Sequence, residues 1–204
     1  MNKKVMIIGA GGHAKVVADI VRKSGDTVVG FLDDDVNKQG REFFGAQVFG
    51  GVSEYARFAE DCVFILGIGN NLIRKRCAEE MACRWYTAIH PSAILGEGVQ
   101  VGEGVCIMAG AIVNADAVLG RHSVVNTGAV VEHDVKIGNY SQICPNSTVC
   151  GMTEIGNEVW VGAGSTVIQC LSVCDGVTLG AGSTVFQNIE ESGTYVGAPI
   201  RKIR

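Results

Sequence analysis

The sequence contains little proline, few aromatic residues and no long apolar segment. Three of its 204 residues are proline and 6% are aromatic. No apolar run approaches the length of about 18 residues that a transmembrane helix needs. Basic residues are not in excess either, because the formal net charge is −4. These absences argue against a membrane span, and against a nucleic acid or an anionic membrane surface as the main partner.

The eight cysteines follow neither a metal-binding nor an export pattern. They include no Cys-x-x-Cys pair and no partnered histidines, the spacing typical of zinc sites. The apolar stretch near the N-terminus is too short for a signal peptide, because it breaks at once into a glycine-rich segment. We therefore expect reduced thiols, no metal site and a cytoplasmic protein.

Glycine is the residue type in excess, with 28 copies spread along the chain. From Ile89 to Val185 an Ile, Leu or Val recurs at every sixth position, seventeen times in succession. Such hexapeptide periodicity predicts a parallel β-helix, in which each six-residue rung points one aliphatic side chain inwards. Three rungs make one coil, so residues 18 apart lie above one another. Glycine often follows the aliphatic residue, where we expect a corner that needs its backbone freedom.

The first 84 residues carry a different pattern. Apolar strands alternate with amphipathic helices, which predicts a small parallel sheet. The expected elements, in order, are strand 4–9, helix 14–23, strand 27–32, strand 62–68 and helix 71–83. We place an α/β domain in residues 1–84 and the β-helix with a C-terminal tail in residues 85–204.

The first expected strand ends in a glycine-rich loop that opens the first helix. Gly9-Ala10-Gly11-Gly12-His13-Ala14 satisfies the pattern G-x-G-x-x-G/A, and Asp33 and Asp34 follow at the end of the second strand. Such a loop presents backbone N–H groups to a phosphate or diphosphate, although a plain tight turn is the alternative. The sheet resembles one half of a Rossmann fold, so a nucleotide diphosphate fits it better than NAD. Gly69 and Asn70, after the next strand, would close the pocket.

One histidine has the surroundings of a general base. His133 lies two residues after an inward aliphatic residue, so its side chain should point away from the core. The adjacent Asp134 carboxylate can fix the imidazole tautomer and raise its basicity. Gly151 lies one coil further in the same column, where its N–H could bind a developing oxyanion.

The other three histidines have different expected places. His90 precedes a proline and is expected to be structural, and His122 is expected to be a solvated corner residue. His13, inside the glycine loop, either contacts the substrate or only supports the loop.

In combination, these motifs resemble the NeuD/PglD family of hexapeptide-repeat transferases. That family comprises bacterial sialic acid O-acetyltransferases and UDP-4-amino-sugar N-acetyltransferases. The segments that carry the resemblance are Ile7–Lys15, Phe31–Asp34, Gly69–Asn71, Ile89–Pro91 and Asn126–Asp134. The resemblance spans nearly the whole chain and implies a left-handed parallel β-helix, acetyl-CoA as co-substrate, no metal and a homotrimer.

The resemblance also implies roles for individual residues. His133 would be the proton acceptor and Asp134 the acid that strengthens it. Gln142 occupies a position where members often have a second histidine, and glutamine cannot titrate near neutrality. The implied substrate contacts are Gly11, Gly12, His13, Asp33, Asp34, Gly69 and Asn126. The implied acetyl-CoA contacts are Gln142, Gly151, Ala163 and Ala181.

The sequence thus predicts an acetyl-CoA-dependent N-acetyltransferase that transfers the acetyl group directly to a nucleotide-linked amino sugar, with no nucleic acid and no membrane as partner. Asp34 and the glycine loop favour a UDP-4-amino sugar, but O-acetylation of sialic acid or a related sugar stays open. A non-catalytic nucleotide-sugar-binding protein is conceivable because of Gln142, although the intact His133-Asp134 pair argues against it. A γ-class carbonic anhydrase would share the fold but would need histidines at metal-binding spacing, which the repeats lack.

Overall fold

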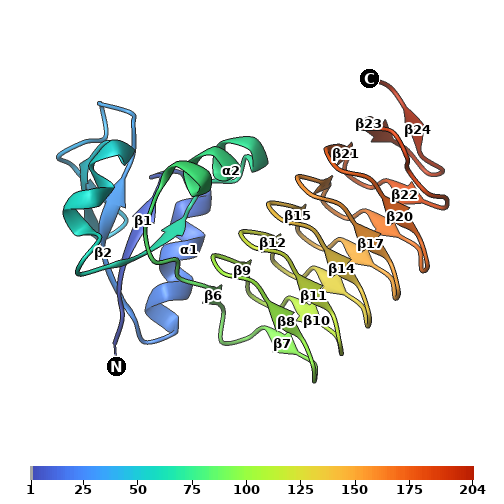
Figure 1. Cartoon of the computed structure of the whole chain (residues 1–204), viewed down its shortest axis with the longest axis horizontal. Coiled ribbons are helices and arrows are strands. Elements are labelled where there is room, and N and C mark those ends of the chain that lie inside the picture. Colours follow the sequence, from blue (N-terminus) through green and yellow to red (C-terminus); the bar gives the residue numbers. More distant parts are fainter. Residues whose placement is uncertain (1) are drawn as a thin grey trace. The chain divides into compact units, whose positions relative to one another are not determined.

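The computed structural model describes residues 2–204, which form two compact units (Figure 1). The first unit ends at Pro91, and the second comprises Ser92–Arg204. The sequence pattern placed the boundary earlier, at 84/85. Residues after 84 still extend the first unit, because the Phe64 N–H donates to the carbonyl of Arg84 at 2.9 Å and the Tyr86 N–H donates to the carbonyl of Phe64 at 2.7 Å.

The first unit is an α/β sheet with the order β3-β4-β2-β1-β5. Its elements are β1 (Lys4–Ile8), α1 (Gly12–Lys23), β2 (Thr27–Leu32), β3 (Glu42–Phe43), β4 (Ala46–Gly50), the 3₁₀ helix η1 (Val52–Phe58), β5 (Val63–Leu66) and α2 (Asn71–Glu80). The short strand β6 (Ala88–Ile89) also falls before Pro91 but is not part of this sheet. Strands β4, β2, β1 and β5 are parallel, and β3 pairs antiparallel with β4. The expected small parallel sheet is confirmed, whereas β3, β4 and η1 were not anticipated.

Strand β1, inside the sheet, is almost entirely buried, so the sheet is a fixed support for the loops at its carboxyl edge. All four residues from Val5 to Ile8 have no exposed surface. On one face, Met6 and Ile8 pack in a cluster with Cys77 of α2 and with Met81, which follows the end of α2. Such two-sided burial is typical of parallel strands. The segments after β1, β2 and β5 therefore leave the sheet at its carboxyl edge, where open parallel sheets bind ligands.

The second unit is a three-sided solenoid of short parallel strands, seen as successive coils in Figure 1. Each strand pairs with the strands 18 residues before and after it, so Val131 lies between Val113 and Val149. This register confirms the predicted parallel β-helix. The strands are β7 (Ile94–Leu95), β8 (Gln100–Val101), β9 (Cys106–Ile107), β10 (Ile112–Val113), β11 (Val118–Leu119), β12 (Val124–Val125), β13 (Val130–Val131), β14 (Lys136–Ile137), β15 (Gln142–Ile143), β16 (Thr148–Val149), β17 (Glu154–Ile155), β18 (Trp160–Val161), β19 (Thr166–Val167), β20 (Ser172–Val173), β21 (Val177–Leu179) and β22 (Thr184–Val185).

Two kinds of side chain fill the solenoid. The periodic aliphatic residues are buried from Ile107 onwards, whereas Leu95 is partly exposed because β7 pairs with a neighbouring coil on one side only. Small residues two positions earlier are also buried. At Ser141, Ser147 and Ser165 the hydroxyl donates to a carbonyl group of the next coil, at 2.7 Å in the bond from Ser147 Oγ to the carbonyl of Gly162.

The glycines after the aliphatic residues correct one expectation. They do not adopt a positive φ, so backbone freedom does not explain them. A Cβ on Gly120 would lie 2.7 Å from the backbone of residues 138–139, and one on Gly138 would lie 2.4 Å from the carbonyl group of Gly156. Glycine is needed because successive coils approach closely at that corner.

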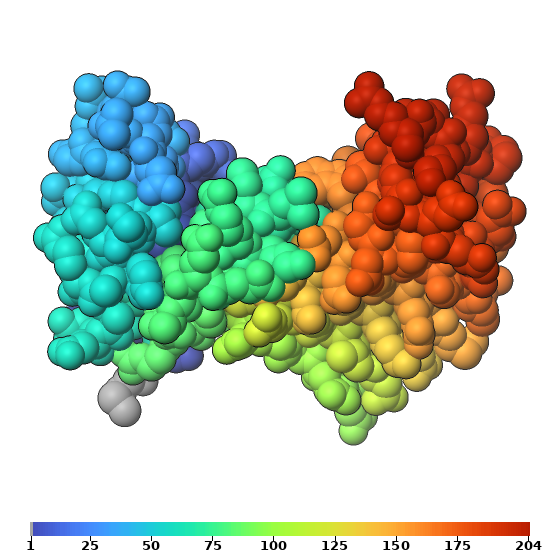
Figure 2. Space-filling model, turned by 45° about the horizontal axis from the view of Figure 1, so that its top comes forward, coloured from blue at the N-terminus to red at the C-terminus, as the bar shows by residue number. Residues whose placement is uncertain are grey.

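The repeats end in a short hairpin. Strand β23 (Gly193–Val196) pairs parallel with β21 and antiparallel with β24 (Arg201–Lys202). Figure 2 shows this tail in red at the surface of the second unit. Over residues 2–204, no helix is long and apolar enough to cross a membrane.

Candidate functional site

His133 and Asp134 lie in the turn that joins β13 to β14. His133 Nδ1 is 2.8 Å from Asp134 Oδ2, and both side chains are about half exposed. Asp134 adopts a left-handed backbone conformation, with φ of 59°, and the Met152 N–H donates to the His133 carbonyl at 3.1 Å. A carboxylate can only accept, so this contact favours the tautomer that has its proton on Nδ1 and its free lone pair on Nε2. The pair is accessible to a substrate, and in that tautomer it could serve general-base chemistry.

Gly151 lies one coil beyond His133. A Cβ at this position would be 2.6 Å from His133 Nε2. The imidazole therefore occupies the space that a side chain at residue 151 would fill. Glycine here lets Nε2 lie against the backbone of the next coil, which is the place where an oxyanion donor would be useful.

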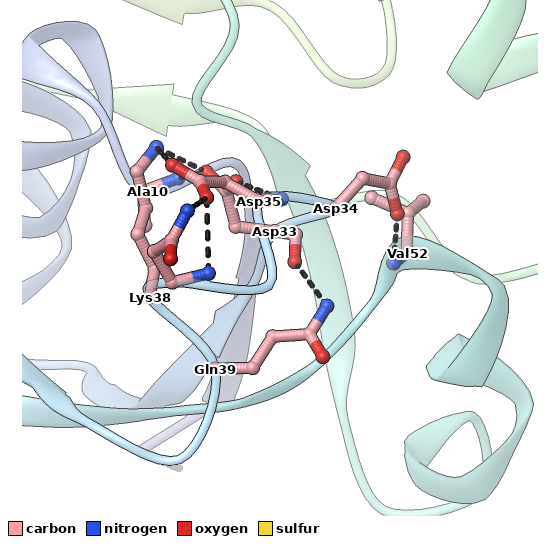
Figure 3. A network of polar contacts seen from close by, with 8 residues as sticks. Ala10, Asp33, Asp34, Asp35, Lys38, Gln39 and Val52 are labelled. Atoms are coloured by element: carbon pink, nitrogen blue, oxygen red, sulfur yellow. Dashed lines mark hydrogen bonds and ion pairs between the residues drawn. The ribbon is translucent and has the colours of Figure 1, made fainter.

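Asp33 braces the glycine loop after β1 (Figure 3). Its Oδ2 accepts from the Ala10 N–H at 2.6 Å and from Lys38 Nζ at 3.1 Å, and its Oδ1 accepts from the Asp35 N–H at 2.9 Å. Burial alone would raise the pKa of the Asp33 carboxyl, but these donors outweigh it and hold the pKa below its usual value. The sequence identified Asp33 but gave no sign of Lys38 as its partner.

The glycines of the loop are not explained by contacts within the protein. A Cβ on Gly11, Gly12 or Gly69 would meet nothing within 4 Å in the described part of the chain, and none of the three has a positive φ. Over the same residues, no side chain caps the N-terminus of α1 at Gly11, and the first turn of this helix has no acidic residue. The loop thus leaves open space over the positive end of a helix, which suits an anion.

His13 lies in the first turn of α1, and Arg74 lies in α2, close enough to affect its charge. Burial, and then the Arg74 guanidinium, lower the pKa of His13 from 6.5 to about 4, so its imidazole is neutral at physiological pH. Within residues 2–204, His13 Nε2 is buried without a hydrogen-bond partner. Arg74 is 1% exposed and donates to the carbonyls of Ile68 and Gly69 at 3.1 Å, which fixes the second loop. The sequence analysis missed Arg74, although it lies three residues from both Asn71 and Cys77 on the buried face of α2.

With this geometry in view, two families match the chain. The PglD N-terminal domain matches residues 4–81, and the bacterial transferase hexapeptide (six repeats) matches residues 116–151. The UDP-N-acetylbacillosamine N-acetyltransferase of Bacillus subtilis is 38% identical over 113 residues, which cover 52% of this chain and 52% of that protein. The chain thus matches about half the length of this curated relative.

Solved structures match over the full length. The acetyltransferase domain of PglB from Neisseria gonorrhoeae is 33% identical with a TM-score of 0.94, covering 99% of this chain and 100% of that one. The chain belongs to the PglD-like family of hexapeptide-repeat sugar acetyltransferases. A variant of GDP-perosamine N-acetyltransferase from Caulobacter crescentus, in complex with CoA and GDP-perosamine, is also 33% identical, with a TM-score of 0.93 over 98% of this chain and 97% of that one.

Membership in the PglD-like family confirms three predictions: the family itself, the α/β domain followed by a left-handed β-helix, and the acetyltransferase class. The PglB domain is also known in complex with acetyl coenzyme A. In the described residues, no group of three or more His, Cys, Asp or Glu side chains could hold a metal ion.

The remaining predicted contacts of this PglD-like chain lie away from His133. Gln142, on β15, is 3% exposed, with Nε2 3.7 Å from Cys144 Sγ and Oε1 without a hydrogen-bond partner within residues 2–204. Asn126 is 9% exposed, and its Oδ1 accepts from the adjacent Thr127 N–H at 2.8 Å. Ala163 and Ala181 are exposed at one corner, where the Gly182 N–H donates to the Ala163 carbonyl at 2.8 Å.

His122 corrects a second expectation, because it is not solvated. It is 2% exposed, and its ring is stacked on Tyr140 with a centroid distance of 5.6 Å. Tyr140 lies one coil further, so the two rings share a column. The sequence suggested a polar corner, whereas the 18-residue register gave the imidazole an aromatic neighbour.

Proposed function

We propose that the protein transfers the acetyl group of acetyl-CoA to the amine of a nucleotide-linked sugar, with His133 as general base. The observation that carries this proposal is the 2.8 Å contact between His133 Nδ1 and Asp134 Oδ2, with Nε2 directed at Gly151. The relatives support the substrate class, because one is named for a UDP-linked sugar and another is bound to CoA and GDP-perosamine.

The reaction is a direct transfer. The sugar amine attacks the thioester carbonyl while His133 Nε2 accepts its proton, and the Gly151 N–H holds the oxyanion that forms. When the carbon–sulfur bond breaks, the CoA thiolate takes up that proton and the imidazole returns to its neutral form. A thiol nucleophile is disfavoured, since burial and the Glu132 carboxylate raise the pKa of the nearby Cys150.

The α/β unit binds the nucleotide. The diphosphate lies over the open N–H groups of Gly11 and Gly12, and Gly69 leaves room on the other side. The neutral His13 offers a ring nitrogen to the ligand without adding charge. Asp33 acts by holding the loop, and Asp34, whose Oδ1 accepts from the Val52 N–H at 2.8 Å, contacts the nucleoside.

The acetyl-CoA contacts come from another copy of the chain. Gln142, Ala163 and Ala181 lie on other parts of the prism than the turn that holds His133. A homotrimer would bring such positions of one copy to the His133 corner of the next. Light scattering should then give a mass near three times the 21.5 kDa of the chain, and a monomer at micromolar concentration would contradict this assembly.

The test of the function is a thiol-release assay with acetyl-CoA. Acceptors would be UDP-linked amino sugars, GDP-perosamine and sialic acids, with mass spectrometry to locate the new acetyl group. We expect turnover with a nucleotide-linked amino sugar and an amide product. Turnover with sialic acid alone, giving an ester, would replace the proposal by O-acetylation. Nucleotide-sugar binding without any turnover would favour a non-catalytic protein.

A further inference from the structure

A pocket of roughly 340 Å³ opens in the first unit between Asp34, η1 and α2. Its apolar lining includes Val52 and Met81, and its polar lining includes Asp34, Arg76 and Glu80. Its lining comes from three segments that are distant in the sequence, and none of the roles proposed above uses α2 side chains in this pocket.

Asp34, which lines the pocket, directly follows Asp33, which holds the glycine loop through its bond to Ala10. Figure 3 shows Asp33 turned towards Ala10 and Lys38, while Asp34 turns the other way, towards Val52. A nucleoside diphosphate whose phosphates lie over the loop extends along the carboxyl edge of the sheet, past the end of β2. Its nucleoside end therefore reaches the side of Asp34 on which the pocket lies.

Charges from two segments converge on this pocket. Burial raises the pKa of the Cys77 thiol; the Arg76 guanidinium opposes this, while the carboxylates of Glu80 and Asp34 add to it. All three charged groups are therefore close to one apolar side chain of the lining. A flat group with apolar faces and a polar edge would match such a pocket.

Nucleobases differ in the edge that they present. Uracil and guanine carry a ring N–H beside a carbonyl oxygen, whereas cytosine and adenine carry an unprotonated ring nitrogen beside an amino group. A carboxylate accepts from the ring N–H, and a guanidinium donates to the carbonyl oxygen. Asp34 or Glu80 together with Arg76 supplies that pair of groups for a keto base. For cytosine or adenine, the guanidinium would face the amino group instead.

We propose that the pocket between η1 and α2 binds the nucleobase of the sugar nucleotide and selects a keto base, with Arg76 and Glu80 as specificity-determining residues. The proposal rests on the nucleotide-sugar function proposed above and adds to it the part of the substrate that the pocket reads. It covers UDP and GDP sugars alike, because both bases present the same pair of groups.

The test is calorimetry of the full-length protein with UDP, CDP, GDP and ADP. UDP and CDP have rings of the same size, as do GDP and ADP, so each pair isolates the edge of the base. The variants are Arg76→Met and Glu80→Gln, both at exposed positions of α2. Glu79→Gln is the matched control, because Glu79 is also exposed on α2 and does not line the pocket.

We expect the wild-type protein to bind the keto base of at least one pair about tenfold or more tightly than its partner. Comparing the affinities for UDP and GDP then shows whether the base is uracil or guanine. Each pocket variant should reduce that preference to about twofold or less, while the Glu79→Gln control keeps it. Wild-type protein that binds none of the four nucleotides would overturn the nucleotide-sugar function and this proposal with it. Wild-type binding without base preference, or a preference that both pocket variants retain, would overturn this proposal alone.

Discussion

Glycines of the solenoid and glycines of the N-terminal loop have opposite surroundings. In the solenoid, a Cβ on Gly120 or Gly138 would collide with the backbone of the next coil. In the loop, a Cβ on Gly11 or Gly12 would meet nothing within 4 Å among the described residues. The solenoid glycines allow successive coils to pack closely, whereas the loop glycines leave room for a bound ligand. An unexplained glycine at a sheet edge is therefore evidence for a ligand.

The same comparison separates structure from function in the solenoid itself. Gly151 differs from its neighbours, because its nearest contact is the ring of His133 rather than backbone. Gly151 lies in the solenoid, but like the loop glycines it is explained by the site and not by close packing of the coils. Substitutions at the three kinds of glycine should consequently give three different outcomes.

The largest of these effects is expected at Gly151. In Gly151→Ala the new methyl group would displace the imidazole of His133, so kcat/KM should fall about 100-fold, or roughly 3 kcal/mol in transition-state binding. The His133 side chain is half exposed and can move, so the thermal midpoint should change little. Steady-state kinetics and thermal melting check this. A variant with normal kcat/KM would show that the position of the ring does not matter.

Gly138→Ala should instead damage the fold. The added Cβ would lie 2.4 Å from the carbonyl group of Gly156, and backbone cannot move aside as a side chain can. We expect a loss of about 1–3 kcal/mol in the free energy of unfolding, as overpacking usually costs. Urea denaturation measures it, with Gly12→Ala as control. A loss no greater than that of the control would contradict the close-approach argument.

Gly12→Ala should leave the fold intact and weaken nucleotide binding. The methyl group has room in the protein itself but projects where we place the diphosphate. We expect the dissociation constant for the nucleotide to rise about tenfold, which corresponds to roughly 1.4 kcal/mol. Calorimetry with the nucleoside diphosphate that binds the wild-type protein best checks this. Unchanged affinity would place the ligand elsewhere on the sheet edge.

A further effect, apart from the three kinds of glycine, should appear in the pH dependence of stability. The pKa of His13 is about 4 in the folded protein and 6.5 when exposed, so the unfolded chain binds more protons between these values. Its contribution is fully present above pH 6.5 and is lost as the pH falls towards 4. His13→Gln should flatten this part of the stability curve. Parallel curves for wild type and variant in urea denaturation between pH 7 and pH 4.5 would contradict it.

The sequence predicted the solenoid well, because its period leaves little freedom. Once each aliphatic residue points inwards, the register of every strand follows, and with it the column shared by His133 and Gly151. The expectation for His122 was wrong because its burial depends on Tyr140 in the next coil. The local sequence around His122 does not contain that neighbour.

The first unit was predicted less completely. The two main helices and three main strands were expected, but β3, β4 and η1 are short elements without a periodic signal. The bond from Ala10 to Asp33 joins residues 23 positions apart, and Arg74 acts through contacts with backbone carbonyls. Such contacts depend on the tertiary structure, and no sequence motif predicts them.

The central claim is that His133 is the general base, and kcat/KM of His133→Ala in the thiol-release assay tests it most directly. We predict a fall of roughly 10²–10⁴-fold at neutral pH with nearly unchanged acetyl-CoA binding, the range that general-base catalysis supplies. Asp134→Ala should cost less, because it removes the group that orients the base and leaves the base itself. If His133→Ala keeps kcat/KM within a factor of about three of the wild-type value, the assignment is wrong and catalysis rests on positioning and the oxyanion donor.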